Sequence, residues 1–257
     1  MKVFLYINKE KDSIDEYELE LRRILLDNDL VVTESIEECD LMISLGGDGT
    51  ILSIAGSDKP ILGINLGHLG YMTALEKNEM HRLSELSGGS FEIEERMMLK
   101  VNLVRNGKCV YENDFLNEAV LGRGDITKLI RFSVYLDGKK AAYHKADGMI
   151  VSTSTGSTAY SMAAGGPILQ PNSKMVAITP ISSHSLTLSR SLVVSPKTEI
   201  TLVSEEQEKV LLSLDGKDAI SVECGDRIIV TESEKTTKLM KLRERSFCDV
   251  LYNKLSI

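Results

Sequence analysis

One short segment limits the possible folds of this chain more than any other. An uninterrupted apolar run, Leu41 to Leu45, ends directly in the sequence Gly46-Gly47-Asp48-Gly49-Thr50. A run of this length is typical of a strand buried on both faces of a parallel sheet. Glycines after such a strand allow a tight turn, and the following residues, Ile51 to Ala55, have the pattern of a helix. We therefore expect a strand, a glycine loop and a helix in succession.

The first ninety residues repeat this alternation. Further apolar runs predict strands at Val3–Ile7, Val31–Val32 and Pro60–Ile64. A helix is expected after Ser13, because Ser13 and Glu16 form a capping-box pattern before apolar residues at helical spacing. Another helix is expected from Met80 to Leu86, ending at Gly88-Gly89. This order predicts a parallel sheet that helices cover on both faces.

The pattern changes near Phe91, after which apolar and polar residues mostly alternate. The segment from Ile130 to Leu136 is typical of a strand with one exposed face. Hairpin turns are predicted at Asn106-Gly107, Asp137-Gly138 and Asp215-Gly216. We expect one helix inside this half, from about Ser157 to Ala164, and one in the tail, from Phe247 to Leu255. The fold class predicted is an α/β domain with a parallel sheet over residues 1–95, plus a β-rich (α+β) domain over residues 96–239.

Composition and charge narrow the function. The chain has 257 residues, of which 42% are hydrophobic, which excludes a disordered protein, and a net charge of −8, which argues against a protein that coats nucleic acid. Residues 1–60 hold 6 basic and 14 acidic side chains, whereas residues 121–197 hold 9 basic and 3 acidic ones. A basic middle in an acidic protein favours binding of a small polyanion.

The sequence also indicates a cellular location. The four cysteines, Cys39, Cys109, Cys224 and Cys248, have neither CxxC nor metal-ligand spacing, so we expect reduced thiols in a cytoplasmic protein. No stretch approaches the length of a membrane span, and the first residues do not have the architecture of a signal peptide. No membrane partner and no protein-held metal site are therefore predicted.

The glycine loop from Gly46 to Thr50 is the first candidate site. Neither GxGxxG nor a P-loop sequence occurs, so a nucleotide must be held by other means. The loop can point backbone N–H groups at a phosphate, with the positive end of the following helix behind them. A carboxylate, Asp48, in the middle of such an anion site indicates phosphoryl transfer. The alternative is a plain turn in which Asp48 caps the helix.

Three further segments carry polar candidates. A predicted strand, Met149 to Val151, enters seven hydroxyl or glycine residues, Ser152 to Thr158, which suit phosphate or ribose unless they form an ordinary surface loop. Asn117-Glu118 follows the β segment Val110 to Leu116 and can bind ribose hydroxyls, or lie on the exposed face of a strand. Lys145 fits a phosphate contact or an exposed strand edge.

Together these segments resemble the NAD kinase family over nearly the whole chain. The matching pieces are Gly46 to Thr50, Gly63 to Gly70, Asn117-Glu118, Asp147 to Pro167 and Pro180 to Leu186. The resemblance implies the NAD kinase/diacylglycerol kinase-like fold, in which the tail, residues 240–257, returns to the first domain. It implies transfer of the terminal phosphoryl group of ATP to the 2′-hydroxyl of the adenosine ribose of NAD, with Mg²⁺ or another divalent cation.

The resemblance also assigns roles. Asp48 is expected to be the catalytic aspartate, and Gly46, Gly47, Gly49 and Thr50 the ATP phosphate loop. The residues expected to contact NAD are Asp48, Gly49, Asn117, Glu118, Lys128, Lys145, Asp147, Thr158, Ala159, Tyr160, Ser161, Met162, Ala163, Ser182 and Lys217. Tyr160 is expected to pack on a ring of NAD. The family also implies a homodimer or homotetramer with the NAD site near a subunit interface.

Two alternatives remain open on the sequence. The GGDG sequence is shared with diacylglycerol-type lipid kinases, although the long hydroxyl segment and Asn117-Glu118 argue against a lipid substrate. A non-catalytic NAD-binding sensor would keep the NAD contacts without needing Asp48 in a phosphate loop. The intact loop from Gly46 to Thr50 therefore favours a kinase.

Overall fold

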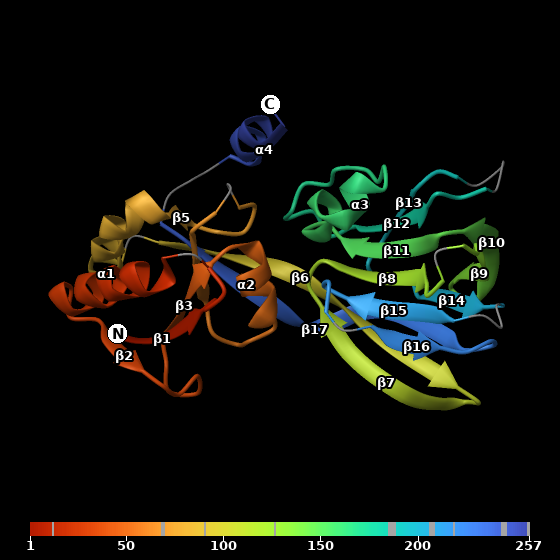
Figure 1. Cartoon of the computed structure of the whole chain (residues 1–257), viewed down its shortest axis with the longest axis horizontal. Coiled ribbons are helices and arrows are strands. Elements are labelled where there is room, and N and C mark those ends of the chain that lie inside the picture. Colours follow the sequence, from red (N-terminus) through yellow and green to blue (C-terminus); the bar gives the residue numbers. More distant parts are fainter. Residues whose placement is uncertain are drawn as a thin grey trace. The chain divides into compact units, whose positions relative to one another are not determined.

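The computed structural model describes residues 1–11, 13–67, 70–89, 91–125, 127–184, 189–205, 209–217, 219–242 and 246–255. The chain divides into two compact units, Met1–Arg96 with Thr236–Ile257, and Met97–Lys235 (Figure 1). The long strands β6 (Glu92–Arg105) and β17 (Arg227–Lys241) each contain a boundary between these units. Each unit is described by itself.

The first unit contains, besides parts of β6 and β17, the elements β1 (Lys2–Ile7), α1 (Ile14–Asp27), β2 (Val31–Thr33), β3 (Leu41–Gly46), α2 (Asp48–Ser53), β4 (Ile61–Asn65), β5 (Leu75–Glu76), the 3₁₀ helix η1 (Lys77–Gly88) and α4 (Phe247–Leu255). It is built on a parallel sheet with the strand order β17–β4–β3–β1–β2. Leu45 pairs with both Ile7 and Ile64. The carboxyl ends of β1, β3 and β4 therefore lie at one edge of the sheet, and so do the segments that follow them.

Helices cover both faces of this sheet, as predicted. Every residue of β3 is buried. Leu41, Ile43 and Leu45 belong to one apolar cluster with Leu21 and Leu25 of α1. Residues of the other parity point to the opposite face. There, Gly46 lies so close to α2 that an added β-carbon would meet the hydroxyl of Thr50 at 2.1 Å.

The start of α1 differs from the prediction in one respect. Ser13 has φ 55° and ψ 23°, in the left-handed region, and its side chain makes no capping hydrogen bond. An N-cap residue normally has extended dihedrals, which aim its side-chain oxygen at the first free N–H groups. The capping box predicted from Ser13 and Glu16 is therefore wrong, although the apolar spacing places the helix correctly.

The second unit consists of antiparallel strands. Its elements besides β6 and β17 are β7 (Lys108–Phe115), β8 (Glu118–Arg123), β9 (Ile130–Leu136), β10 (Lys139–Ala146), β11 (Gly148–Thr153), the 3₁₀ helix η2 (Gly156–Thr158), α3 (Tyr160–Ala163), β12 (Val176–Ile181), β13 (Leu192–Val194), β14 (Ile200–Ser204), β15 (Val210–Leu214) and β16 (Ile220–Val222). Six strands form one sheet in the order β13–β12–β11–β8–β15–β16. Phe132 of β9, from the other sheet, shares an apolar cluster with Met149 and Val151 of β11.

All three predicted hairpin turns are confirmed. In each, the first residue has a positive φ, 49° at Asn106, 48° at Asp137 and 50° at Asp215, and the glycine after it has one too. Two consecutive residues with positive φ are the requirement of a type I′ turn, whose twist matches the strands it joins. The turns connect β6 to β7, β9 to β10 and β15 to β16.

Two local predictions need correction. The helix expected from Ser157 to Ala164 is two short pieces, η2 and α3, separated by Ala159 at φ −98° and ψ −128°. The polar face expected for β9 is only partly exposed, since Ser133 is buried and donates its hydroxyl to Glu205. Within the ranges that the structure describes, no helix combines the length and apolar character needed to cross a membrane.

Candidate active site

The carboxylate of Asp48 has a fixed orientation in the first unit. Asp48 is the first residue of α2, and Gly47 occupies the N-cap position, so the alternative that Asp48 caps the helix is wrong. The backbone N–H groups of Tyr71 and Met72 donate to Oδ2 and Oδ1 of Asp48 at 2.8 and 3.0 Å. Each carboxylate oxygen retains a second lone pair for a hydroxyl donor. Asp48 can therefore accept a substrate proton or hydrogen bond without moving.

The segment that holds Asp48 was not identified as a site from the sequence. The sequence feature that could have revealed this segment is Gly70, the last residue of the glycine-containing segment Gly63 to Gly70. A β-carbon at Gly70 would meet Asp48 Oδ1 at 2.6 Å. The absence of a side chain at Gly70 thus allows the N–H groups of Tyr71 and Met72 to reach the carboxylate. His68 and Leu69 lie outside the described residues.

The glycines of the loop differ in what surrounds them. The N–H of Gly47 donates to the hydroxyl of Thr50 at 3.2 Å, so that group is engaged inside the loop. Nothing lies within 4 Å of a β-carbon built at Gly49. The helix that follows has six residues, which limits its dipole. In this structure, Gly49 is the point of the loop that is open to a ligand.

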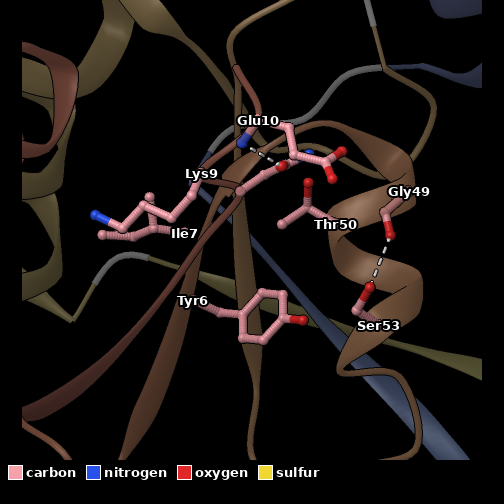
Figure 2. Close-up of a pocket in the computed structure, with 8 residues that line it drawn as sticks. Tyr6, Ile7, Lys9, Glu10, Gly49, Thr50 and Ser53 are labelled. Atoms are coloured by element: carbon pink, nitrogen blue, oxygen red, sulfur yellow. Dashed lines mark hydrogen bonds between the residues drawn. The ribbon is translucent and has the colours of Figure 1, made fainter. Parts of the chain in front are cut away.

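A cleft of about 380 Å³ adjoins Gly49 (Figure 2). It is lined by Tyr6, Ile7, Asn8, Lys9, Glu10, Gly49, Thr50 and Ser53. The chain after β1 leads to β2 on one side, whereas the chain after β3 leads to β4 on the other. Open parallel sheets bind ligands at such a switch point, beyond the carboxyl ends of the strands. Sequence analysis did not assign the Tyr6–Glu10 side of this cleft.

Figure 2 shows how the two sides of the cleft are held. On one side, the backbone N–H of Glu10 donates to Oδ1 of Asn8 at 3.0 Å. On the other, the hydroxyl of Ser53 donates to the carbonyl oxygen of Gly49 at 3.3 Å, one turn along α2. The side chain of Lys9 is largely exposed, and its ammonium bonds Glu18 at 2.5 Å. The cleft therefore combines fixed backbone with one cation at its rim.

In the second unit, Asn117 and Glu118 are buried rather than exposed. They are 8% and 7% exposed, and Glu118 begins β8. The alternative that they lie on the exposed face of a strand is therefore wrong. Burial, and next the neighbouring Asp215, raise the pKa of Glu118 to about 7. Its Oε2 atom has no hydrogen-bond partner among the described residues.

Two turns lock the Asn117-Glu118 segment in place. Asp215 accepts the backbone N–H groups of Leu116, Asn117 and Glu118 at 2.8, 2.7 and 3.1 Å. The N–H of Thr153 donates to the carbonyl oxygen of Asn117 at 2.9 Å. The segment after β11 lies so close to Asn117 that a β-carbon at Gly156 would be 2.1 Å from the carbonyl oxygen of Asn117.

In the segment from Ser152 to Thr158, hydroxyl groups bond to the backbone of the protein itself. All residues from Ser152 to Thr158 are buried, so it is not a surface loop. The hydroxyl of Thr153 donates to the carbonyl of Leu116 at 2.6 Å, and that of Ser157 donates to the carbonyl of Ser154 at 2.7 Å. In this structure both hydroxyl hydrogens are used to shape the turn.

The expected NAD contacts from Thr158 to Ala163 follow this turn. Ser161 is fully buried and shares a hydrogen bond of 3.1 Å with Thr179 of β12, which fixes α3 against the sheet. Tyr160, on the same short helix, is 45% exposed. Its ring is thus available to pack against a ligand. Lys217, also exposed, lies two residues after Asp215, at the same end of the sheet.

The remaining expected NAD contacts lie elsewhere in this unit. The N–H of His184 donates to the carbonyl of Lys145 at 2.9 Å, and that of Asp147 to the carbonyl of Ile181, beside Ser182. Lys128 precedes β9 at the same end, since Ile130 pairs with Ala146. Asp147 also pairs with Arg123 at 3.1 Å, a cation that the sequence analysis missed. Ser185 and Leu186 lie outside the described residues.

The expected NAD contacts of the second unit therefore form two groups. Asn117, Glu118 and α3 lie near Thr153, at the carboxyl end of β11, whereas Asp147 directly precedes its amino end. With a rise of about 3.3 Å per residue, Asp147 and Thr153 are roughly 20 Å apart. We call these the Glu118 group and the Asp147 group. The structure brings together the members of each group, but not the two groups.

Family models match most of the chain. The model of the ATP-NAD kinase N-terminal domain matches residues 6–86, and that of the ATP-NAD kinase C-terminal domain matches residues 116–242. The chain belongs to the ATP-NAD kinase family. This confirms the resemblance drawn from the loop of Asp48 and the segment beginning at Asp147. It also removes the lipid-kinase alternative.

Individual members of the ATP-NAD kinase family are similar over most of their length. The NAD kinase of Caldanaerobacter subterraneus subsp. tengcongensis is 40% identical over 229 residues, which cover 87% of this chain and 81% of that protein. The NAD kinase of Geotalea daltonii is also 40% identical, over 225 residues, which cover 85% of this chain and 79% of that protein.

Solved structures of the family have the same fold. The crystal structure of yeast NADH kinase complexed with NADH aligns with a TM-score of 0.87 at 24% identity, covering 100% of this chain and 87% of that one. The structure of an NAD kinase from Archaeoglobus fulgidus in complex with ATP aligns with a TM-score of 0.83 at 24% identity, covering both chains completely. The predicted fold class is confirmed.

Proposed function

We propose that this chain is an enzyme that transfers the terminal phosphoryl group of ATP to the 2′-hydroxyl of the adenosine ribose of NAD, forming NADP. The observation that carries the proposal is the carboxylate of Asp48, fixed by two N–H groups inside a glycine loop beside an open cleft. Membership of the ATP-NAD kinase family supports the choice of substrates. A sensor without activity would not need this loop.

Asp48 acts on the acceptor hydroxyl. Because phosphoryl transfer passes through a loose transition state, little proton removal is needed early in the reaction. Asp48 therefore contributes first by orienting the hydroxyl and then by accepting its proton. The N–H groups of Tyr71 and Met72 keep the carboxylate in one orientation, so that no reorganisation is needed when the hydroxyl attacks.

ATP occupies the cleft at the switch point. Its phosphates lie near Gly49, where the absence of a side chain leaves room, and Gly46, Gly47 and Thr50 shape the loop. Among the described residues, no group of three or more His, Cys, Asp or Glu side chains is arranged to hold a metal. A Mg²⁺ ion would therefore enter with ATP and would neutralise charge on its phosphates.

The Glu118 group binds NAD in the second unit. The carboxylate of Glu118 accepts a ribose hydroxyl, Asn117 contributes its amide, and Tyr160 packs on a ring. The wall around this NAD site is formed by Thr158, Ala159, Ser161, Met162, Ala163 and Lys217.

The Asp147 group completes an NAD site in a neighbouring copy of the chain. Its distance from the Glu118 group along β11 supports this role, which assigns Lys128, Lys145, Asp147 and Ser182 to the interface of a homodimer or homotetramer. Mixing the inactive variants Glu118→Ala and Asp147→Ala should then restore about a quarter of the activity in a dimer, because one site in each mixed dimer is intact. No recovery on mixing would contradict shared sites.

The proposed activity has a direct test. Purified protein with Mg²⁺, ATP and NAD should yield NADP, detected by an NADP-specific dehydrogenase. Asp48→Ala should abolish NADP formation while calorimetry still detects NAD binding. Absence of NADP with the unaltered protein, despite binding of NAD, would favour a sensor.

The thiol state of all four cysteines supports the expectation that the enzyme works in the cytoplasm.

A further inference from the structure

The tail of the chain contacts the segment that holds Asp48. In α4, the ammonium of Lys254 lies 3.9 Å from the centre of the Tyr71 ring. Tyr71 is the residue whose backbone N–H donates to Oδ2 of Asp48 at 2.8 Å. Lys254 of α4 therefore contacts a residue that itself binds Asp48, the carboxylate proposed to act on the acceptor hydroxyl. All these residues belong to the first unit.

The contact uses the face of the Tyr71 ring. The hydroxyl of Tyr71 is buried without a hydrogen-bond partner among the described residues. A cation over an aromatic face is attracted by the negative charge of that face, and the attraction grows when the cation is partly shielded from water. Lys254 is half-buried, so this condition is met. The tyrosine ring therefore serves as a platform for the ammonium.

The charges around Lys254 explain why an ammonium is tolerated there. Burial lowers the pKa of Lys254 below its ordinary 10.5, while the carboxylates of Asp48 in α2 and Glu76 in β5 oppose that decrease. Burial, and next the charge of Asp48, raise the pKa of the Tyr71 phenol. Lys254 is thus a cation held among an aromatic ring and two acidic side chains.

We propose that Lys254 is a positioning residue for phosphoryl transfer, which presses the 70–72 segment onto Asp48 through the ring of Tyr71. The inference rests on the proposed role of Asp48. It makes α4 part of the catalytic apparatus, although α4 follows the glycine loop by about two hundred residues. Loss of the ammonium should loosen the two N–H groups that orient the carboxylate, and a small misplacement of a reacting group has a large effect on rate.

The first test removes the charge and keeps the chain length. Lys254→Met should lower kcat for NADP formation about tenfold, with the KM for NAD nearly unchanged, and Lys254→Arg should restore most of the rate. The matched control is Lys77→Met, which removes another ammonium of the first unit, 5.6 Å from the Tyr17 ring. Lys77 lies outside the proposed site, so its variant should keep the normal kcat.

A double-mutant cycle tests the path through Tyr71. Tyr71→Phe keeps the ring, so in that background Lys254→Met should lower kcat by the same factor as in the unaltered protein. Tyr71→Leu removes the ring but leaves the backbone N–H, and should lower kcat as Lys254→Met does. The double variant Tyr71→Leu/Lys254→Met should be no slower than either single variant. Additive losses would overturn the proposed path.

The pH profile separates positioning by charge from simple packing. In the unaltered enzyme, kcat should fall on the alkaline side below pH 10.5 as Lys254 loses its proton. In Lys254→Arg the guanidinium stays charged, so that alkaline decrease should disappear. Tyr71→Phe should keep it, which excludes titration of the phenol. An identical alkaline decrease in Lys254→Arg would overturn the proposal.

NADP formation by the unaltered protein distinguishes a failure of the proposed function from a failure of the proposed role of Lys254. If the unaltered protein forms no NADP, the proposed function fails, whatever the variants do. If it forms NADP and Lys254→Met has a normal kcat, only the role of Lys254 fails. Thermal unfolding of each variant shows whether a reduced rate reflects lost structure. A Lys254→Met protein that melts normally but turns over slowly supports the inference.

Discussion

Asp215 and Glu118 are joined by two hydrogen bonds that run in opposite directions, each donated by a backbone N–H. The N–H of Glu118 donates to Oδ1 of Asp215 at 3.1 Å, and the N–H of Asp215 donates to the carbonyl oxygen of Glu118 at 2.9 Å. Asp215 is also the first of the two central residues of a type I′ turn, at φ 50°. One residue thus forms a hairpin and fixes the start of the strand that carries the proposed ribose-binding carboxylate.

The first prediction concerns Asp215→Asn. Asparagine tolerates the positive φ, but it has one acceptor oxygen where three N–H groups need acceptors. An N–H group left without an acceptor should cost about 1–3 kcal/mol of the free energy of unfolding. We also expect the KM for NAD to rise more than kcat falls, since Glu118 is displaced. Chemical denaturation and steady-state kinetics measure the two effects.

Asp137→Asn is the matched control. Asp137 occupies the same turn position in the β9–β10 hairpin, with φ 48°, and among the described residues its Oδ1 accepts one N–H, that of Glu199, at 3.0 Å. The amide oxygen of asparagine can replace that one acceptor. The control should therefore keep both stability and KM, and an equal loss in the two variants would contradict the special role of Asp215.

The second prediction concerns the pH dependence of Glu118. Its folded-state pKa, about 7, lies above the ordinary 4.5 because burial and Asp215 disfavour the charge. A group with a raised pKa stabilises the fold fully below pH 4.5, and this contribution is lost as the pH rises through 7. Glu118→Gln cannot ionise. Relative to the unaltered protein, it should gain up to about 3 kcal/mol in free energy of unfolding between pH 5 and 8.

NAD binding should show the opposite pH dependence. The ionised carboxylate accepts ribose hydroxyls, so the affinity of the unaltered protein for NAD should rise as the pH increases through 7. Glu118→Gln should bind NAD weakly with little change over that range. Calorimetric titrations at several pH values measure this. A parallel pH dependence in both proteins would assign the titration to another group.

The third prediction compares two glycines of the loop. Gly46→Ala should destabilise the protein, because its β-carbon would lie 2.1 Å from the hydroxyl of Thr50. Gly49→Ala should be tolerated or stabilising by up to about 1 kcal/mol, since the position is helical and nothing lies within 4 Å. Because the ATP phosphates are proposed to lie near Gly49, the methyl group should raise the KM for ATP, while thermal unfolding shows no loss of stability. An unchanged KM for ATP would place the phosphates elsewhere.

The sequence predicted the fold well where local patterns decide it. Leu41 to Leu45 reads as a buried strand because both faces of β3 are covered, and Asp215-Gly216 reads as a turn because positive φ needs such residues. The hydrogen bonds from Tyr71 and Met72 to Asp48 could not be predicted, since Gly70 signals a close approach but not the carboxylate that is approached. The same holds for Lys254, whose role depends on a tertiary contact across the first unit.

The last prediction concerns His144, a buried residue of β10. Its ring stacks on Phe132 with the centres 5.5 Å apart and the planes at 19°, and its Nδ1 lies 3.3 Å from the hydroxyl of Ser183. Burial lowers the pKa of His144 below 6.5. The neutral ring therefore stabilises the fold fully above pH 6.5, and this contribution is lost as the pH falls. His144→Phe keeps the stacking and cannot be protonated, so its free energy of unfolding relative to the unaltered protein should rise steadily from pH 7 to pH 5. Urea denaturation at matched pH values measures this difference, and a constant difference over that range would show that protonation of His144 does not limit acid stability.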